Sequence, residues 1–113
     1  MKVSIITVCF NSEKTIEDTL MSVQSQTYPD IEHIIIDGLS KDNTNNIIEK
    51  YANSVAVHIS EEDKGLYDAM NKGISLATGE IVGVLNSDDV FSTQNTIQTL
   101  VQTIGNEDGV YGD

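Results

Sequence analysis

The stretch Ile81-Val82-Gly83-Val84-Leu85-Asn86-Ser87-Asp88-Asp89 joins an apolar run to a cluster of polar side chains. Residues 81–85 have the apolar, β-branched composition of a strand that is buried in a sheet. Two carboxylates, an amide and a hydroxyl follow where this strand should end. Adjacent carboxylates repel each other and are costly to bury bare, and a divalent cation such as Mg²⁺ or Mn²⁺ removes that cost. A solvated acidic turn is the alternative, because Asn, Ser and Asp are common turn residues.

Three further apolar runs along the chain have the composition of strands. They cover residues 3–8, 32–37 and 55–59, and another run starts at residues 109–112. Between the runs, apolar residues recur at the spacing of an amphipathic helix. The predicted helices lie between Asn11-Ser12 and Tyr28-Pro29, around Ile47–Tyr51, from Leu66 to Ala77, and after Ser92 or Thr93. Strands that alternate with helices predict an α/β domain with a mainly parallel sheet sandwiched by helices.

Polar residues follow each predicted strand. Asn11 comes after the first strand, Asp37 ends the second, Asp63 lies in the loop after the third, and Asp88 comes after the fourth. Because ligands of parallel α/β sheets bind beyond the carboxyl ends of the strands, these four segments should meet at one edge. The sequence therefore predicts a binding site at this edge rather than scattered acidic turns.

The length and charge of the chain restrict its function. Its 113 residues are enough for one domain, residues 1–113, and too few for two. The formal net charge of −12, from 18 acidic against 6 basic residues, argues against nucleic acid or anionic lipid as a partner. An anionic ligand would need a cation or backbone donors. No run approaches the roughly 20 apolar residues of a membrane span, so we expect no transmembrane segment and a cytoplasmic protein.

Several common motifs are missing from the sequence. No Gly-x-Gly-x-x-Gly follows the first strand and no Gly-x-x-x-x-Gly-Lys-Ser/Thr occurs, which disfavours a dinucleotide-dependent oxidoreductase and a P-loop NTPase. Cys9, the single cysteine, ends an apolar strand and is predicted to be a buried, inert thiol. His33 and His58 lie in or beside apolar strands and are predicted to be structural. A carboxylate-plus-metal site for a nucleotide diphosphate fits the acidic strand ends best.

Five segments of the chain match, in order, the motifs of a known enzyme family. They are Ser4–Asn11 (SIITVCFN), Ile35–Thr44 (IIDGLSKDNT), Glu62–Gly73 (EDKGLYDAMNKG), Ala77–Glu80 (ATGE) and Leu85–Asp89 (LNSDD). In these segments the chain resembles the family 2 glycosyltransferases, which have the GT-A fold. The resemblance covers essentially the whole chain. It implies a Rossmann-like GT-A nucleotide-binding half that takes a nucleoside-diphosphate-sugar donor.

The resemblance implies nucleotide-binding roles for residues in the first three polar segments. Thr7 and Asn11 correspond to residues that line the nucleoside pocket, and Asp37 to a residue that hydrogen-bonds the base. A carboxylate at a strand end can accept a base N–H, and the alternative for Asp37 is a helix N-cap. Asp63 is similar to the family's loop acid near the nucleoside.

Further roles are implied on the third helix and after the fourth strand. The nucleotide-binding residues expected there are Asn71, Lys72, Asn86, Ser87 and Asp88. Lys72 could neutralise a phosphate, with a solvated lysine as the alternative. The family motif after the strand is usually Asp-x-Asp, so Asn86 replaces its first acid, and ribose hydrogen bonding would survive that change. Asp88 then corresponds to the metal ligand, and Asp89 to a second ligand or an outer-shell partner for Mn²⁺ or Mg²⁺.

The resemblance also implies what this chain lacks. Family members carry the acceptor pocket and a catalytic carboxylate base downstream of the Asp-rich strand, and this chain ends at Asp113. The expected activity of the whole enzyme is inverting transfer of a sugar, from a donor with UDP as the family-weighted guess, to a glycan or lipid-linked acceptor. The chain is expected to be the donor-binding half, inactive alone. A sheet edge left uncovered would invite homodimerisation, and the full-length protein could lie peripherally at the inner face of the membrane.

Two other functions fit an acidic α/β domain less well. A receiver-like regulatory domain needs a carboxylate pair just after the first strand, where this chain has Cys9-Phe10-Asn11. A nucleotidyltransferase needs a glycine- and arginine-rich loop at the same place, which is missing. Both alternatives remain open at this point.

Overall fold

The computed structural model describes residues 1–91 and 93–105, in which strands alternate with helices. The strands are β1 (Val3–Cys9), β2 (Ile31–Asp37), β3 (Val57–Ser60) and β4 (Ile81–Val84). The helices are α1 (Ile16–Gln24), α2 (Thr44–Glu49), the 3₁₀ helix η1 (Ala52–Ser54), α3 (Leu66–Leu76) and α4 (Thr96–Gly105). The run predicted at residues 109–112 lies outside the described residues.

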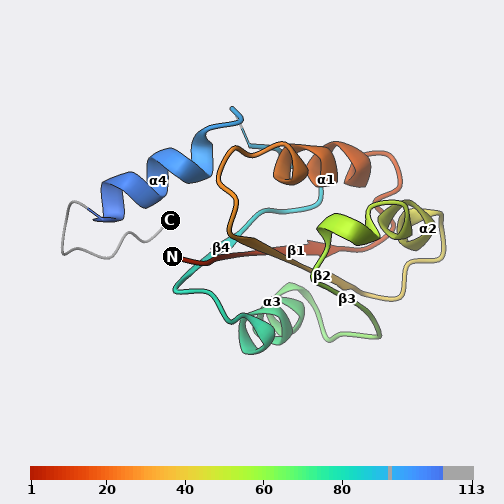
Figure 1. Ribbon diagram of the computed structural model, residues 1–113. Helices are drawn as coiled ribbons and strands as arrows, with labels where there is room; N and C mark the ends of the chain where they lie inside the picture. The colour runs from red at the N-terminus through yellow and green to blue at the C-terminus, as the bar shows by residue number, and fades with distance from the viewer. Residues whose placement is uncertain (92, 106–113) are drawn as a thin grey trace.

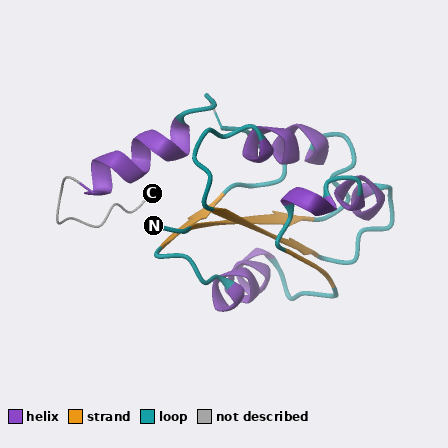
Figure 2. Ribbon diagram, in the orientation of Figure 1, coloured by secondary structure: helices purple, strands orange, loops and turns teal. Residues whose placement is uncertain are grey.

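The strands form one parallel sheet in the order β3-β2-β1-β4. Helices α1 and α2 lie on one side of this sheet and α3 lies on the other, as Figure 1 shows, and the layers are distinct when coloured by secondary structure in Figure 2. The predicted fold class, an α/β domain with a parallel sheet between helices, is confirmed. None of the helices within residues 1–91 and 93–105 is long and apolar enough to span a membrane.

The three consecutive isoleucines of β2 supply core to both faces of the sheet. Successive strand side chains point to opposite faces. Ile35 packs with Leu20 of α1 and Ile48 of α2, whereas Ile34 and Ile36 pack with residues of the α3 side. An uninterrupted apolar run is therefore what a strand covered on both faces requires.

Glycine at position 73 allows α3 to approach β1 closely. A Cβ atom there would lie 2.4 Å from Cγ2 of Ile6, which is too close for two carbon atoms. This explains a glycine in the middle of an eleven-residue helix, where it costs about 1 kcal/mol relative to alanine.

The last described strand is less buried than its sequence predicts. Val82 and Val84 are 44% and 42% exposed, so the prediction of a fully buried strand at residues 81–85 is wrong for these two side chains. The reason is position: β4 pairs with β1 alone among the described strands and forms an edge of the sheet. The expected uncovered edge and the expected homodimer both stay predictions.

Candidate functional site

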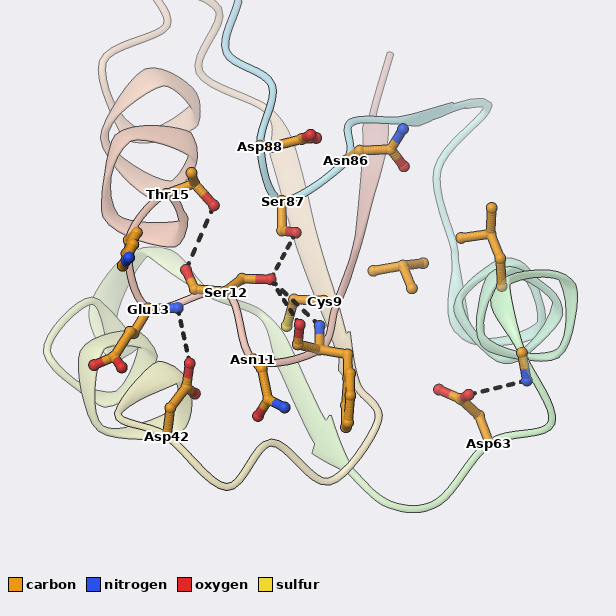
Figure 3. A pocket seen from close by; sticks show the side chains of 15 residues that line it. Cys9, Asn11, Ser12, Glu13, Thr15, Asp42, Asp63, Asn86, Ser87 and Asp88 are labelled. Carbon is orange, nitrogen blue, oxygen red and sulfur yellow. Dashed lines mark hydrogen bonds between the residues drawn. The ribbon is translucent and has the colours of Figure 1, made fainter.

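A cavity of about 780 Å³ opens beyond the carboxyl ends of β1 and β4. Four segments that are distant in sequence line it: residues 8–15 at and after the end of β1, Asp42 before α2, residues 63–66 at the start of α3, and residues 86–88 after β4. Figure 3 shows the labelled side chains arriving from these separate segments. The cavity includes Asn11, Asp63, Asn86, Ser87 and Asp88, five of the residues that the sequence singled out.

Hydrogen bonds from α1 hold the turn that carries Asp88. The hydroxyl of Thr19 shares its proton between the backbone carbonyl oxygens of Ser87 and Asp89, at 2.9 and 2.6 Å. The hydroxyls of Ser12 and Ser87 lie 2.9 Å apart, which ties the turn to the loop after β1. Thr19 is fully buried and was missed from the sequence, because a lone threonine on an apolar helix face gives no signal of a distant partner.

The loop after β1 brings Asn11 to the cavity in a left-handed conformation. Asn11 has a φ of 49°, which asparagine tolerates better than most residues. Its backbone N–H donates to Oγ of Ser40 at 2.7 Å, and its Oδ1 accepts from the backbone N–H of Lys41 at 2.8 Å. The side-chain carbonyl of Asn11 is therefore already used to join two loops.

Asp37 lies inside the protein, and this placement argues against the expected contact with a base. Its carboxylate is fully buried and accepts hydrogen bonds from the Ser40 backbone N–H at 2.8 Å, from Ser60 Oγ at 2.8 Å and from Asn45 Nδ2 at 3.1 Å. Further bonds come from the Ser40 hydroxyl and the Cys9 thiol. Burial raises the pKa of this carboxyl, but the hydrogen bonds outweigh it and hold the pKa below its usual range. Both carboxylate oxygens of Asp37 therefore accept hydrogen bonds from the protein itself, and the side chain joins several segments of the fold.

Thr7 is not among the residues that line the cavity. It is fully buried in the sheet, with its Oγ1 2.8 Å from Nε2 of His33. Its expected place in a nucleoside pocket stays a prediction that this burial disfavours.

The cysteine and the two histidines have the structural surroundings predicted for them. His33 is buried, and burial lowers its pKa to about 4, which keeps the imidazole neutral. The ring of His58 pairs with Oδ1 of Asn45 at 2.8 Å. Burial, followed by the effect of Asp37, raises the pKa of the Cys9 thiol far above its usual value.

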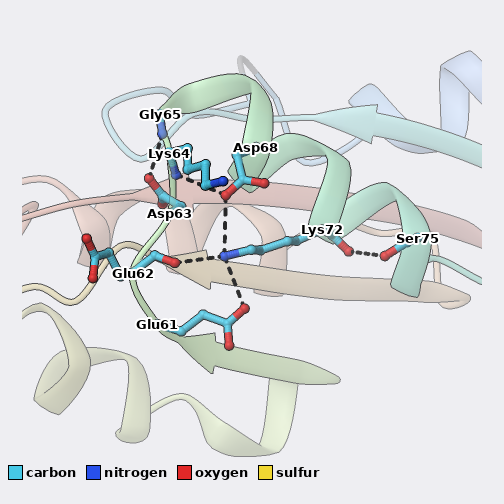
Figure 4. Close-up of polar contacts among 8 residues, drawn as sticks. All are labelled: Glu61, Glu62, Asp63, Lys64, Gly65, Asp68, Lys72 and Ser75. Carbon is cyan, nitrogen blue, oxygen red and sulfur yellow. Dashed lines mark hydrogen bonds and ion pairs between the residues drawn. The ribbon is translucent and has the colours of Figure 1, made fainter.

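Lys72 and Asn71 are not among the residues that line the cavity. Asn71 is exposed on α3. The ammonium of Lys72 lies 3.1 Å from Glu61 Oε1 and 3.6 Å from Asp68 Oδ2, and it donates to the Glu62 carbonyl at 3.0 Å, as Figure 4 shows. The expectation that Lys72 neutralises a phosphate stays a prediction, and such a phosphate would compete with neighbouring acids of the same loop and helix.

The cavity is acidic, and its residues suit a cation that a ligand helps to hold. Four carboxylates line it, from Glu13, Asp42, Asp63 and Asp88, with Lys14 as the lysine among the lining residues. Asp88 lies at the cavity, whereas Asp89 is not among the lining residues. No group of three His, Cys, Asp or Glu side chains within the described ranges could hold a metal alone. Magnesium commonly binds one or two carboxylates plus substrate phosphates and water, which this donor set fits.

Phe10 is a site residue that the sequence reasoning passed over. Its ring is 59% exposed and lines the cavity beside Asp63. The available signal was its position: an aromatic residue directly after a buried strand stands at the ligand-binding end of a parallel sheet.

Comparison with solved structures shows the same fold in TarS and in a mannosyltransferase. The crystal structure of Staphylococcus aureus TarS 1–349 in complex with UDP-GlcNAc matches with a TM-score of 0.86 and 31% identity, over 94% of this chain and 32% of that one. The mannosyltransferase PcManGT from Pyrobaculum calidifontis, in complex with GDP-Man and Mn²⁺, matches with a TM-score of 0.83 and 27% identity, over 91% of this chain and 32% of that one.

Curated relatives agree with the structural comparison. An uncharacterized glycosyltransferase of Mycobacterium tuberculosis is 39% identical over 103 residues, which is 90% of this chain and 39% of that protein. Glycosyltransferase GlyG of Streptococcus pneumoniae is 33% identical over 109 residues, which is 94% of this chain and 36% of that protein. The chain thus spans less than two fifths of the length of these relatives. The family model described as Glycosyl transferase family 2 matches residues 4–113, and the chain belongs to that family.

Proposed function

We propose that this chain is the donor-binding part of an inverting, metal-dependent glycosyltransferase whose donor is a UDP-linked sugar. The observation that carries the proposal is the cavity at the carboxyl ends of β1 and β4, to which four separate segments contribute Asn11, Asp42, Asp63 and Asp88. Two solved structures with the same fold support the proposal: TarS is in complex with UDP-GlcNAc, and PcManGT is in complex with GDP-Man and Mn²⁺.

The lining residues divide naturally between the parts of such a donor. The exposed ring of Phe10 offers a stacking surface for the base, and the carboxylate of Asp63 beside it can accept a base N–H. Asn86 and Ser87 offer an amide and a hydroxyl to the ribose. Asp88 would hold the divalent cation, with Asp89 retained only as an outer-shell partner because it does not line the cavity.

The acidic cavity explains why a cation is part of the proposal. A diphosphate brought among four carboxylates would be repelled, and a divalent cation supplies the neutralisation that Lys14 alone does not. When bound, Mn²⁺ or Mg²⁺ would act as a Lewis acid that stabilises the diphosphate leaving group. Asp88 binds and orients in this scheme and moves no proton.

The complete reaction needs residues beyond those in this chain. The acceptor hydroxyl oxygen would form a bond to the anomeric carbon while the bond from that carbon to the diphosphate breaks with its electron pair. The proton of the hydroxyl would go to a carboxylate base from a segment downstream, and configuration at the anomeric carbon inverts. We therefore propose that this chain alone binds the donor and does not transfer it.

The remaining parts of the proposal concern the whole protein. We propose a glycan or lipid-linked acceptor of the kind found in cell-surface polysaccharides. One relative, TuaG of Bacillus subtilis, is 40% identical over 90 residues and is described as a putative teichuronic acid biosynthesis glycosyltransferase. A lipid-linked acceptor would bring the full-length protein to the inner face of a membrane, and the open β4 edge would serve a homodimer contact.

Calorimetric titration with UDP, with and without Mn²⁺, tests the proposed function. The parent chain should bind UDP more tightly when Mn²⁺ is present. Asp88→Asn should remove that enhancement and leave metal-free binding within about twofold. Glu49→Gln, at an exposed position at the end of α2, changes the charge equally and should behave as the parent. If UDP does not bind the parent, the donor assignment fails, and if Asp88→Asn keeps the full Mn²⁺ effect, the metal assignment fails.

A further inference from the structure

The loop between β3 and α3 is held by a cluster of charged residues on one side of the cavity. We call it the Lys72 cluster, and it consists of Glu61, Glu62, Asp68 and Lys72 (Figure 4). Lys72 reaches the first part of the loop from α3, with its Nζ 3.1 Å from the Glu61 carboxylate and 3.0 Å from the Glu62 carbonyl oxygen. Its third contact, at 3.6 Å, is with Asp68 on the same helix. The two shorter contacts are within hydrogen-bond distance, and the longer one to Asp68 is an ion pair.

The second part of the same loop is held by Asp68. Its Oδ2 accepts a hydrogen bond from the backbone N–H of Lys64 at 2.9 Å. Gly65 then has a φ of 118°, a conformation that favours glycine, and α3 begins at the next residue. Lys72 and Asp68 therefore fix the chain before and after Asp63, and they contact each other.

Asp63 is held at the cavity between these two attachments. Its Oδ1 accepts from the backbone N–H of Gly65 at 3.1 Å. Its Oδ2 lies only 2.8 Å from the point where a Cβ of residue 38 would stand, so the carboxylate packs over the bare backbone of Gly38. The Phe10 ring is also in contact with that point, at 3.5 Å. A shift of the loop would move the Asp63 carboxylate away from Phe10 and from the backbone of Gly38.

We propose that Lys72, together with Asp68, is a positioning residue that sets Asp63 against the nucleoside of the donor, and that it acts through Asp63 rather than on the diphosphate. This inference rests on the proposed function, since it assigns a role within the same site. A diphosphate could recruit Lys72 only by displacing two carboxylates and a backbone carbonyl. The geometry instead gives Lys72 a role at the loop.

The test compares uridine with UDP, because only one of them has a diphosphate. Lys72→Met should weaken binding of uridine and of UDP with Mn²⁺ by the same factor, about fivefold. Asp63→Asn should produce a similar loss for both ligands. The double variant should lose little more than Asp63→Asn alone, since the lysine has nothing left to position. Uridine binding can be followed by NMR titration and UDP binding by calorimetry.

Controls separate this inference from folding and from the proposed function. Lys50→Met, at an exposed position after α2, makes the same chemical change and should bind both ligands as the parent does. Asp68→Ala removes the acceptor for the Lys64 backbone N–H and should repeat the uniform loss if Lys72→Met proves too unstable for study. A loss confined to UDP, or losses from Lys72→Met and Asp63→Asn that simply multiply, would overturn the inference. Failure of the parent to bind either ligand would instead refute the proposed function.

Discussion

Lowering the pH from 7 to 4 should destabilise this protein through His33. The side chain is 2% exposed, and burial lowers its pKa to about 4, against an ordinary value of 6.5. The unfolded chain therefore binds a proton as the pH falls through 6.5, while the folded protein does not until about pH 4. Stability from this group is fully present above pH 6.5 and is lost between these two values, by about 3 kcal/mol.

Urea unfolding at pH 7, 6, 5 and 4, followed by circular dichroism, measures this loss. His33→Gln is the matched control, because an amide can keep a hydrogen bond to Thr7 without titrating in this range. Carboxylates with lowered pKa values, such as Asp37, also lose stability as the pH falls, but they do so in both proteins. The difference between the two pH profiles isolates His33. Profiles that run parallel from pH 7 to 4, or an NMR titration of His33 with its midpoint above pH 6, would refute the reasoning.

Three other substitutions test the packing and the site. Asp37→Ala should destabilise the fold by about 3 kcal/mol in urea unfolding, because several buried donors would lose their hydrogen-bond acceptor. A loss of UDP affinity with unchanged stability would instead support the base-contact role. Gly73→Ala should lower stability by about 1–3 kcal/mol despite better helix propensity, since the new methyl would meet Ile6, and an unchanged melting temperature would contradict that contact. Thr19→Val should lower stability by about 1–3 kcal/mol in urea unfolding, because two part-buried carbonyl oxygens lose their donor, and it should weaken Mn²⁺-dependent UDP binding about fivefold in calorimetry by releasing the turn at Ser87; equal affinity would show that the turn keeps its conformation without this contact.

The fold could be predicted from local pattern because each strand carries its own signal. The three isoleucines of β2 require cover on both faces, and alternation with helical spacing then fixes a parallel sheet. The convergence of Asn11, Asp63 and Asp88 followed from the same topology, since parallel strands end at one edge. These predictions depend only on the order of elements.

The errors arose where partners come from distant segments. A carboxylate at a strand end suits either a ligand or the protein itself, and the donors that decide for Asp37 belong to Ser40, Asn45 and Ser60, on three different segments. The ion pair of Lys72 could not be predicted for the same reason, because its acidic neighbour Glu61 is eleven residues away and meets it only when α3 packs on the sheet. No local pattern contains that information.

The open edge of β4 has a consequence for the behaviour of the chain in solution. Exposed Val82 and Val84 lie on β4, which pairs with β1 alone among the described strands and offers a surface where strands of other molecules can add. At low ionic strength a net charge of −12 keeps such molecules apart, and added salt screens that repulsion while leaving the apolar contact intact. Salt, which makes many proteins easier to handle, should therefore promote clustering here, and light scattering that stays flat from low to high ionic strength would exclude it.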